Sequence, residues 1–232
     1  MNLAELAFAC YIYTRMTDFD GSYCRFLEKV SPQLDLKQER HRMALLKWLN
    51  DWGCRQFALL YHPLASREIG DWYQHCGQEL FPEDCTLLSL TDTEFAKVQP
   101  AYSNLVGRPA SIRKLKDGGE TQVQIGPTGA AKILFAIRPK ALIPWDDSIR
   151  NELNLDASAR SYCVYLRVAQ EYLQELNCVC RKLGFDLNNL PLMLGRPNST
   201  VAKLIDEYAW VTISRKCPTP EKEEFMRWVD WS

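Results

Sequence analysis

The sequence predicts an all-α protein, a compact bundle of eight to ten helices with space for one small β-hairpin. Apolar residues recur every three or four positions through most of the 232-residue chain, and capping residues stand where these patterns begin and end. The composition is ordinary for a globular protein, with 47% hydrophobic and 25% charged residues. No internal repeat or low-complexity linker divides it. We therefore expect a single globular unit, residues 1–232, with an N-terminal helical lobe over 1–107 and a hairpin-containing lobe over 108–232.

The N-terminal lobe is expected to be helical almost throughout. Apolar residues at helical spacing predict a first helix over 2–16, and the turn sequence DFDG at 18–21 ends it. Residues 37–52 form a strongly amphipathic segment, and Gly53 suits the left-handed conformation that often follows a helix. The apolar run at 57–61 fits either a strand or a helix. Further helices are expected over 22–30, 66–80 and 91–106.

The least helical part of the chain is residues 108–124. Its Asp117-Gly118-Gly119 sequence is typical of a turn, and the flanks can pair as a small hairpin or remain a mobile loop. Helical spacing returns further along. Helices are expected over 157–183, over 199–213, and from Pro220 onwards, the last carrying Phe225, Trp228 and Trp231.

Composition also limits the class of protein. The net charge is −1, so the chain as a whole is no basic nucleic-acid binder. No apolar stretch is long enough to span a bilayer, and Glu5 stands where a signal peptide carries Lys or Arg. The nine cysteines are odd in number and contain no Cys-x-x-Cys pair, which favours reduced thiols over disulfides or a metal site. We expect a cytoplasmic protein without membrane contact, metal or cofactor.

The most informative segment is IGPTGAAKILFAIRPKALIPWDDSIRNEL, residues 125–153. Thr128 is expected to cap a helix beginning at Gly129, and this helix is apolar almost all round, so it should be central. An arginine-proline pair ends it. The following loop returns the chain to a second helix, capped by Asp146 or Asp147. The segment thus predicts a helix-hairpin-helix arrangement with two carboxylates at the start of its second helix.

This pattern resembles the helix-hairpin-helix DNA glycosylase superfamily, in which a glycine hairpin precedes an essential aspartate. Gly126 matches the second hairpin glycine, and the essential aspartate then falls on Asp146 or Asp147. The segment also resembles a group of uncharacterised bacterial proteins that share the core AxKxLxxxRPxLxxxWDxxI. The resemblance covers about thirty of the 232 residues. It implies a scaffold that binds DNA and cleaves the bond between a base and its sugar.

Two departures from that superfamily narrow the expected activity. Val123 or Gln124 stands where the first hairpin glycine belongs. Thr128 occupies the place of the lysine nucleophile of bifunctional glycosylases, and Lys132 lies one helical turn further on. The resemblance therefore implies a monofunctional N-glycosidase, which uses a carboxylate and no Schiff base.

A carboxylate suits this chemistry, because breaking an N-glycosidic bond develops positive charge on the sugar. Asp146 and Asp147 are the candidate catalytic residues, and Trp145 beside them can stack on a base. Each has a plainer interpretation. An aspartate at a helix start is a common cap, and a tryptophan that follows proline commonly belongs to a core.

Basic residues are concentrated in one region of the sequence. Residues 108–140 carry a net charge of +5, which leaves −6 for the rest of the chain. Basic side chains beside a glycine turn can hold phosphate, although a solvated loop has the same composition. The candidate nucleic-acid-binding residues are Gly126, Thr128, Gly129, Lys132, Arg113, Lys114, Lys116 and Trp145.

Two functions remain open from the sequence. One is a monofunctional N-glycosidase that acts on a base in DNA or in a nucleotide. The other is a non-catalytic module on the same scaffold that binds nucleic acid or protein and uses its aspartates only as caps. Signatures of other chemistries are absent from the sequence, including the phosphate-binding loop, the serine-nucleophile turn and the His-Glu-x-x-His zinc pair.

Overall fold

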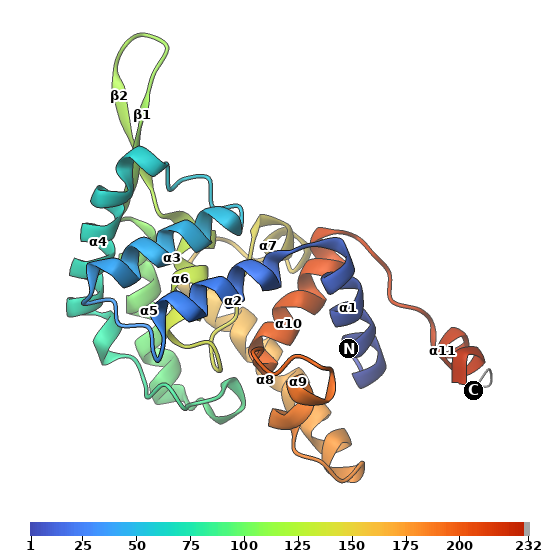
Figure 1. The fold of residues 1–232 in the computed structure, drawn as a ribbon. Coiled ribbons are helices and arrows are strands. Elements are labelled where there is room, and N and C mark those ends of the chain that lie inside the picture. The colour runs from blue at the N-terminus through green and yellow to red at the C-terminus, as the bar shows by residue number, and fades with distance from the viewer. Residues whose placement is uncertain (230–232) are drawn as a thin grey trace.

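The computed structural model describes residues 1–229 and shows a mainly helical protein from which a single two-stranded sheet projects (Figure 1). The helices are α1 (Leu3–Met16), α2 (Phe19–Val30), α3 (Glu39–Asp51), α4 (His62–His75), α5 (Asp92–Val106), α6 (Gly126–Ile137), α7 (Asp147–Glu152), α8 (Ala159–Lys182), α9 (Leu190–Met193), α10 (Val201–Ala209) and α11 (Lys222–Val229). The strands are β1 (Pro109–Lys114) and β2 (Glu120–Gln124). The predicted helical fold with one hairpin is confirmed. Short helices such as α9 raise the number within residues 1–229 above the expected eight to ten.

The structure corrects both ends of one expected helix and assigns the run that the sequence left ambiguous. The helix expected over 66–80 begins at His62, since Pro63 fits the first helical turn, and it ends at His75. The ambiguous run at 57–61 contains a short 3-10 helix, Leu59–Tyr61. The last helix carries Phe225 as expected. Trp231 and the side chain of Trp228 lie outside the part that the structure describes.

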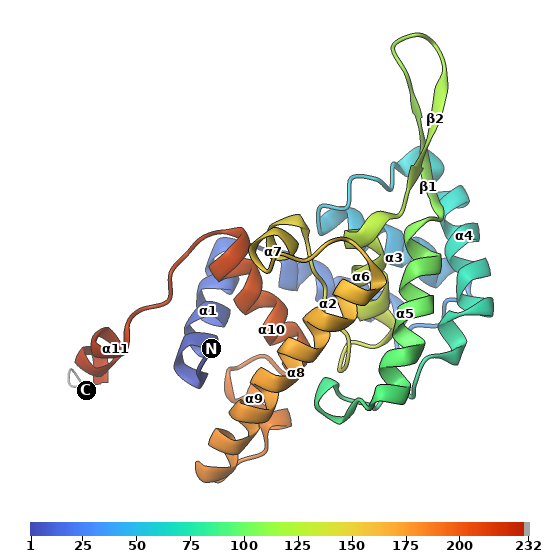
Figure 2. The same ribbon diagram turned by 180° about the vertical axis from the view of Figure 1, so that it is seen from behind.

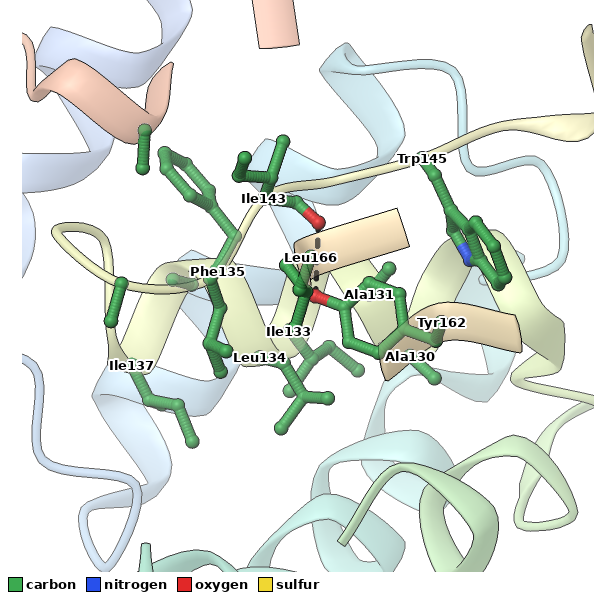
Figure 3. Packing of buried hydrophobic residues seen from close by; sticks show 14 of the residues in the cluster. Ala130, Ala131, Ile133, Leu134, Phe135, Ile137, Ile143, Trp145, Tyr162 and Leu166 are labelled. Atoms are coloured by element: carbon green, nitrogen blue, oxygen red, sulfur yellow. Dashed lines mark hydrogen bonds between the residues drawn. The ribbon is translucent and has the colours of Figure 1, made fainter. Parts of the chain in front are cut away.

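Helix α6 is the centre of the hydrophobic core. Eight of its twelve residues are buried, because its sequence is apolar nearly all round. Figure 3 shows its side chains against Tyr162 and Leu166 of α8 and Ile143 of the following loop. The Tyr162 hydroxyl donates a 2.9 Å hydrogen bond to the carbonyl of Ile143. The main hydrophobic cluster takes residues from both 1–107 and 108–232.

The β1–β2 hairpin stands away from the helices, as Figures 1 and 2 both show. Its strands are antiparallel, with Ile112 opposite Gln122. The base is anchored, because the Ser111 hydroxyl donates to the Gln56 carbonyl at 2.7 Å. Residues 113–122 are all exposed. A free two-stranded hairpin is only marginally stable in water, so the anchored base holds it in place.

A buried ionic cluster joins α2 to α10. Lys203, which is fully buried, donates to Asp20 at 2.6 Å and also to Glu207. Arg196 binds the same two carboxylates. Two cations and two anions thus neutralise one another, which is the arrangement that makes buried charge tolerable.

All nine cysteines are free thiols in the structure. Burial raises the pKa of the Cys54 thiol, and Cys54 lies one residue from Gly53 at the end of α3. Within residues 1–229, no helix is both long enough and apolar enough to cross a bilayer.

Candidate active site

A cavity of about 210 Å³ lies where α6, the start of α7 and the end of α10 meet α1, α2 and the end of α3. Four residues that the sequence marked as functional line it together: Thr128, Lys132, Trp145 and Asp146. These four residues lie within the segment 125–153. The other residues that line the cavity, such as Tyr13, Trp52 and Asp206, come from elements far away in the sequence. The structure therefore gathers the central part of the predicted site around one space.

Asp146 is the N-cap of α7 and a wall of the cavity. One oxygen, Oδ1, accepts a 2.9 Å hydrogen bond from the backbone N–H of Ile149. The other, Oδ2, accepts a 2.9 Å hydrogen bond from the hydroxyl of Ser214. The side chain is only half-buried, so one edge of a tightly oriented carboxylate remains open to the cavity.

Ser214 reaches Asp146 because α10 ends in a π-helical turn, η5 (Trp210–Ser214). Such turns are rare and often occur at functional sites, since the wider turn re-aims the side chains around it. Here it places the Ser214 hydroxyl on Asp146 and the Trp210 ring in the cavity wall. The sequence suggested an uninterrupted helix over 199–213 and gave no sign of this turn.

Asp147 has different surroundings from its neighbour. Its side chain is 84% exposed and pairs with Arg150, and it does not line the cavity. The sequence left open which aspartate corresponds to the essential one. Of the two aspartates, Asp146 lines the cavity and Asp147 does not, so Asp147 supplies a matched control.

Lys132 also points into this space. Its ammonium donates a 2.6 Å hydrogen bond to the Trp52 carbonyl and lies 5.5 Å from the centre of the Trp52 ring. A carbonyl at a helix end carries partial negative charge, which suits a cation. The lysine is thus held in place at the cavity wall.

Trp145 is buried, with 1% of its surface exposed. Its indole N–H donates to the Tyr102 hydroxyl at 3.2 Å, and its ring stacks on Tyr165 at 5.7 Å between centroids. Figure 3 shows it among the core residues beside α6. Trp145 therefore contributes to the inner wall of the cavity and offers no open surface for stacking.

The other aromatic walls come from elements that the sequence did not connect with the site. Trp52, Phe19, Trp210 and Tyr13 form a continuous chain of ring contacts, with centroid separations of 6.2, 5.8 and 5.4 Å along it. Tyr13 and Trp52 are buried, whereas Phe19 and Trp210 are half-exposed. Flat aromatic walls favour a flat ligand.

Asp206 is a residue of the site that the sequence did not predict. Its side chain is 9% exposed and lines the cavity from α10. Burial raises the pKa of this carboxyl from 3.8 to about 7. A signal did exist, because Asp206 stands four residues after Ala202 and three before Ala209, both buried on the apolar face of the helix. A carboxylate on such a face is the pattern to look for.

The glycine turn is arranged differently from the expectation. Helix α6 begins at Gly126, whose φ of +69° favours glycine, and Pro127 occupies the first turn. Thr128 therefore lies inside the helix and is not its cap. Gly129 is closely packed, because a Cβ there would lie 2.5 Å from the Gln56 amide nitrogen and 3.1 Å from Ile125 Cγ2, so the Gln56 side chain would have to move. The segment before the turn is strand β2, while α6, the loop and α7 follow in the expected order.

The basic residues do not form one surface. Arg113, Lys114 and Lys116 lie on the projecting hairpin and are exposed. Arg138, by contrast, is buried, with its Nε donating to the Phe81 carbonyl at 2.6 Å, and Lys132 faces the cavity. The charge that the sequence grouped together is thus divided between a hairpin, a core and a cavity.

No family model, curated protein or solved structure matches this chain. The resemblance to helix-hairpin-helix glycosylases therefore stays a prediction. Among residues 1–229, no group of three or more His, Cys, Asp or Glu side chains is arranged to hold a metal ion.

Proposed function

We propose that the protein is a monofunctional N-glycosidase, which hydrolyses the bond between a base and its sugar in DNA or in a nucleotide. The observation that carries this proposal is the position of Asp146. Its carboxylate is oriented by two hydrogen bonds, from the Ile149 N–H and the Ser214 hydroxyl, at the edge of an aromatic cavity. A fixed carboxylate beside a space for a flat ring is what this reaction needs.

The reaction proceeds as follows. The C1′–N bond breaks, its electron pair leaves with the base, and positive charge develops on the sugar. The Asp146 carboxylate stabilises that charge and accepts a proton from the attacking water, whose oxygen bonds to C1′. The departing base takes one proton from solvent at its nitrogen, Asp146 returns the proton of the water to solvent, and the sugar keeps the hydroxyl. One water is consumed for each bond broken.

Two features support water as the nucleophile in place of lysine. Thr128 stands where the resemblance requires a lysine nucleophile. Lys132, the lysine of the cavity, has its ammonium bound to the Trp52 carbonyl at 2.6 Å. A Schiff base requires a free amine, and an ammonium held in a hydrogen bond is poorly suited to that role.

The size of the cavity supports a base as the part of the substrate that enters. Pockets for drug-sized ligands have volumes of about 300–1,000 Å³. This cavity, at about 210 Å³, is smaller and suits a single flat ring system. The sugar and phosphate would then remain at the surface, near the half-exposed side chains of Thr128 and Asp146.

The projecting hairpin is the proposed contact to the nucleic-acid backbone. Arg113, Lys114 and Lys116 are exposed on an element that no other part of the described chain covers beyond its base (Figure 2). Basic side chains on such an element can reach phosphates, which supply most of the sequence-independent affinity for DNA. The hairpin leads directly into Gly126 and the cavity wall at Thr128.

One observation favours the non-catalytic alternative. Both oxygens of Asp146 already accept hydrogen bonds within the protein, as in a purely structural cap. In that case the scaffold binds nucleic acid or a protein through the same surface and cleaves nothing. The two functions differ in what happens when the carboxylate becomes an amide.

The test is release of free base from duplex oligonucleotides that each contain one altered base, and from free nucleosides, measured by chromatography. The wild type is expected to release base from at least one substrate, and Asp146→Asn to lower that rate by about 100-fold or more. Asparagine is also a good N-cap, so the variant should fold. The matched control is Asp147→Asn, which should release base at the wild-type rate. Absence of release by the wild type from every substrate contradicts the proposal.

A further inference from the structure

Asp206 is a buried carboxyl group without a protein partner. Only 9% of its surface is exposed, yet no hydrogen bond or ion pair joins its side chain to any residue within 1–229. Burying a carboxyl without a partner is costly. Because the side chain lines the cavity, the space left for its partner is the cavity itself.

The nearby cations are already engaged elsewhere. Lys203, three positions before Asp206 on α10, binds Asp20 and Glu207 in the ionic cluster. Lys132 donates to the Trp52 carbonyl. Neither lysine forms an ion pair with Asp206, so the carboxyl is surrounded by charges that are satisfied without it.

Burial is the largest of the effects that change the pKa of the Asp206 carboxyl. It raises the pKa of Asp206 to about 7, with Glu207 and Asp146 raising it further and the two lysines opposing them. Asp206 therefore carries a proton through the mildly acidic range and loses it above neutral pH. The charged and titratable groups around it are Lys203 and Glu207 on α10, Lys132 on α6, Asp146 before α7, Tyr13 on α1, and Tyr162 and Tyr165 on α8.

A protonated carboxyl offers a donor and an acceptor side by side. Adenine presents the complementary pair on its outer edge, where ring nitrogen N7 accepts and the N6 amino group donates. Guanine presents two acceptors at the corresponding positions. The half-exposed aromatic rings of Phe19 and Trp210 line the cavity and supply flat walls for such a base.

We propose that Asp206, in its protonated form, is the specificity-determining residue of the cavity and pairs with an uncharged 6-aminopurine base. The O–H donates to the ring nitrogen and the carbonyl oxygen accepts from the amino group. The proton remains on Asp206 in the bound state. The inference rests on the proposed function, because it names the base that enters the site.

Charge provides the selectivity against other bases. A positively charged, N-alkylated base cannot accept the Asp206 proton at its alkylated nitrogen, and Lys132 repels it. At higher pH Asp206 loses its proton and can only accept hydrogen bonds, so a carboxylate oxygen then faces the ring nitrogen of adenine, which is also an acceptor. Adenine should therefore bind more weakly as the pH rises above neutrality.

The experiment measures binding of free adenine at pH 6 and pH 8.5. Three tryptophans line the cavity, so quenching of their fluorescence reports occupancy, and calorimetry checks the affinity. The wild type is expected to bind at least about tenfold more weakly at pH 8.5, since each pH unit above the pKa removes about tenfold of the protonated form. Asp206→Asn keeps an amide donor beside a carbonyl acceptor, so it should bind adenine without the pH dependence.

The control is Asp147→Asn, which should bind adenine with the pH dependence of the wild type. Three results overturn the inference: no binding of adenine by the wild type, binding that does not change with pH, or a pH dependence that persists in Asp206→Asn. These readouts need no turnover. If base is released but adenine binding is the same in the wild type and in Asp206→Asn at both pH values, the inference fails and the proposed function stands. If adenine binds through Asp206 but no base is ever released, the proposed function fails.

Discussion

The hydroxyl of Ser214 donates a hydrogen bond to the Asp146 carboxylate at 2.9 Å, across 68 positions of the chain. Ser214 closes the π-helical turn after α10, and Asp146 opens α7. Asp206, on α10 itself, lines the same cavity. The end of one helix thus orients the candidate carboxylate, while the body of that helix supplies a second carboxyl.

Replacing Ser214 by alanine tests this orientation. Loss of one hydrogen bond to a carboxylate should lower the free energy of unfolding by about 1–2 kcal/mol. It should also slow base release by about tenfold, because Asp146 becomes free to rotate. Urea unfolding and the base-release assay measure the two effects. The control is Thr212→Ala, which loses a hydroxyl bond to the Tyr208 carbonyl at 2.7 Å in the same turn and should leave release unchanged. Equal rates in the two variants would contradict a positioning role for Ser214.

Asp206→Asn should change the dependence of stability on pH. The folded-state pKa is about 7, against an ordinary value of 3.8, so the folded protein binds the proton more tightly than the unfolded chain. The stabilisation is complete below about pH 4, declines as the pH rises and is lost above about pH 7. The free energy of unfolding of the wild type should therefore fall across this window relative to the variant, by up to about 4 kcal/mol. Urea titrations at pH 4.5, 6, 7.5 and 9 measure the difference, and a difference that stays constant with pH would contradict it.

Much of the fold could be predicted because its signals are local. The all-round apolar sequence of α6 predicts a central helix, and the structure buries eight of its twelve residues. Asp146 was recognised as one of two possible caps from its position alone. The start of α6 was missed although its signal was present. Pro127 lacks an N–H and favours the first turn, so it takes precedence over Thr128 as a cap.

The site could be predicted only in part, because its walls come from distant elements. Tyr13, Trp52 and Asp206 meet Asp146 in one cavity, yet no periodicity in the sequence relates them. The protonation of Asp206 follows from burial, which depends on the whole fold. The net charge of a segment also does not show which side chains face solvent. For that reason the sequence places buried Arg138 in the same basic region as the exposed hairpin residues.

The buried ionic cluster should be essential to the stability of the protein. Lys203→Met leaves Asp20 and Glu207 with only Arg196 as a cation, and should lower the free energy of unfolding by about 3–5 kcal/mol. Chemical denaturation measures the loss. The comparison is Arg25→Gln, which breaks an exposed pair with Asp18 at 3.4 Å and should cost less than about 1 kcal/mol.

A double variant separates lost charge balance from lost packing. Adding Glu207→Leu to Lys203→Met removes one anion together with one cation, so part of the lost stability should return. A double variant that is less stable than Lys203→Met alone would show that Glu207 stabilises the fold through Arg196 rather than through Lys203.

The projecting hairpin should control how binding of duplex DNA responds to salt. Each phosphate contact contributes about 0.9 to the slope of log K against log salt concentration. Replacing Arg113, Lys114 and Lys116 together by glutamine should therefore reduce that slope by about 3 and weaken binding without regard to DNA sequence. Fluorescence anisotropy of a labelled duplex at several salt concentrations measures the slope.

The matched control removes the same charge elsewhere on the protein. Lys29, Arg181 and Lys182 are exposed at the ends of α2 and α8, away from the hairpin (Figure 1). Their triple replacement by glutamine changes the net charge equally but should leave the slope near its wild-type value, because direct phosphate contacts fix the slope and overall charge has a smaller, screened effect. Equal slopes for the two triple variants would place the nucleic-acid contact outside the hairpin. Binding that does not vary with salt in the wild type would remove the phosphate backbone from the proposal altogether.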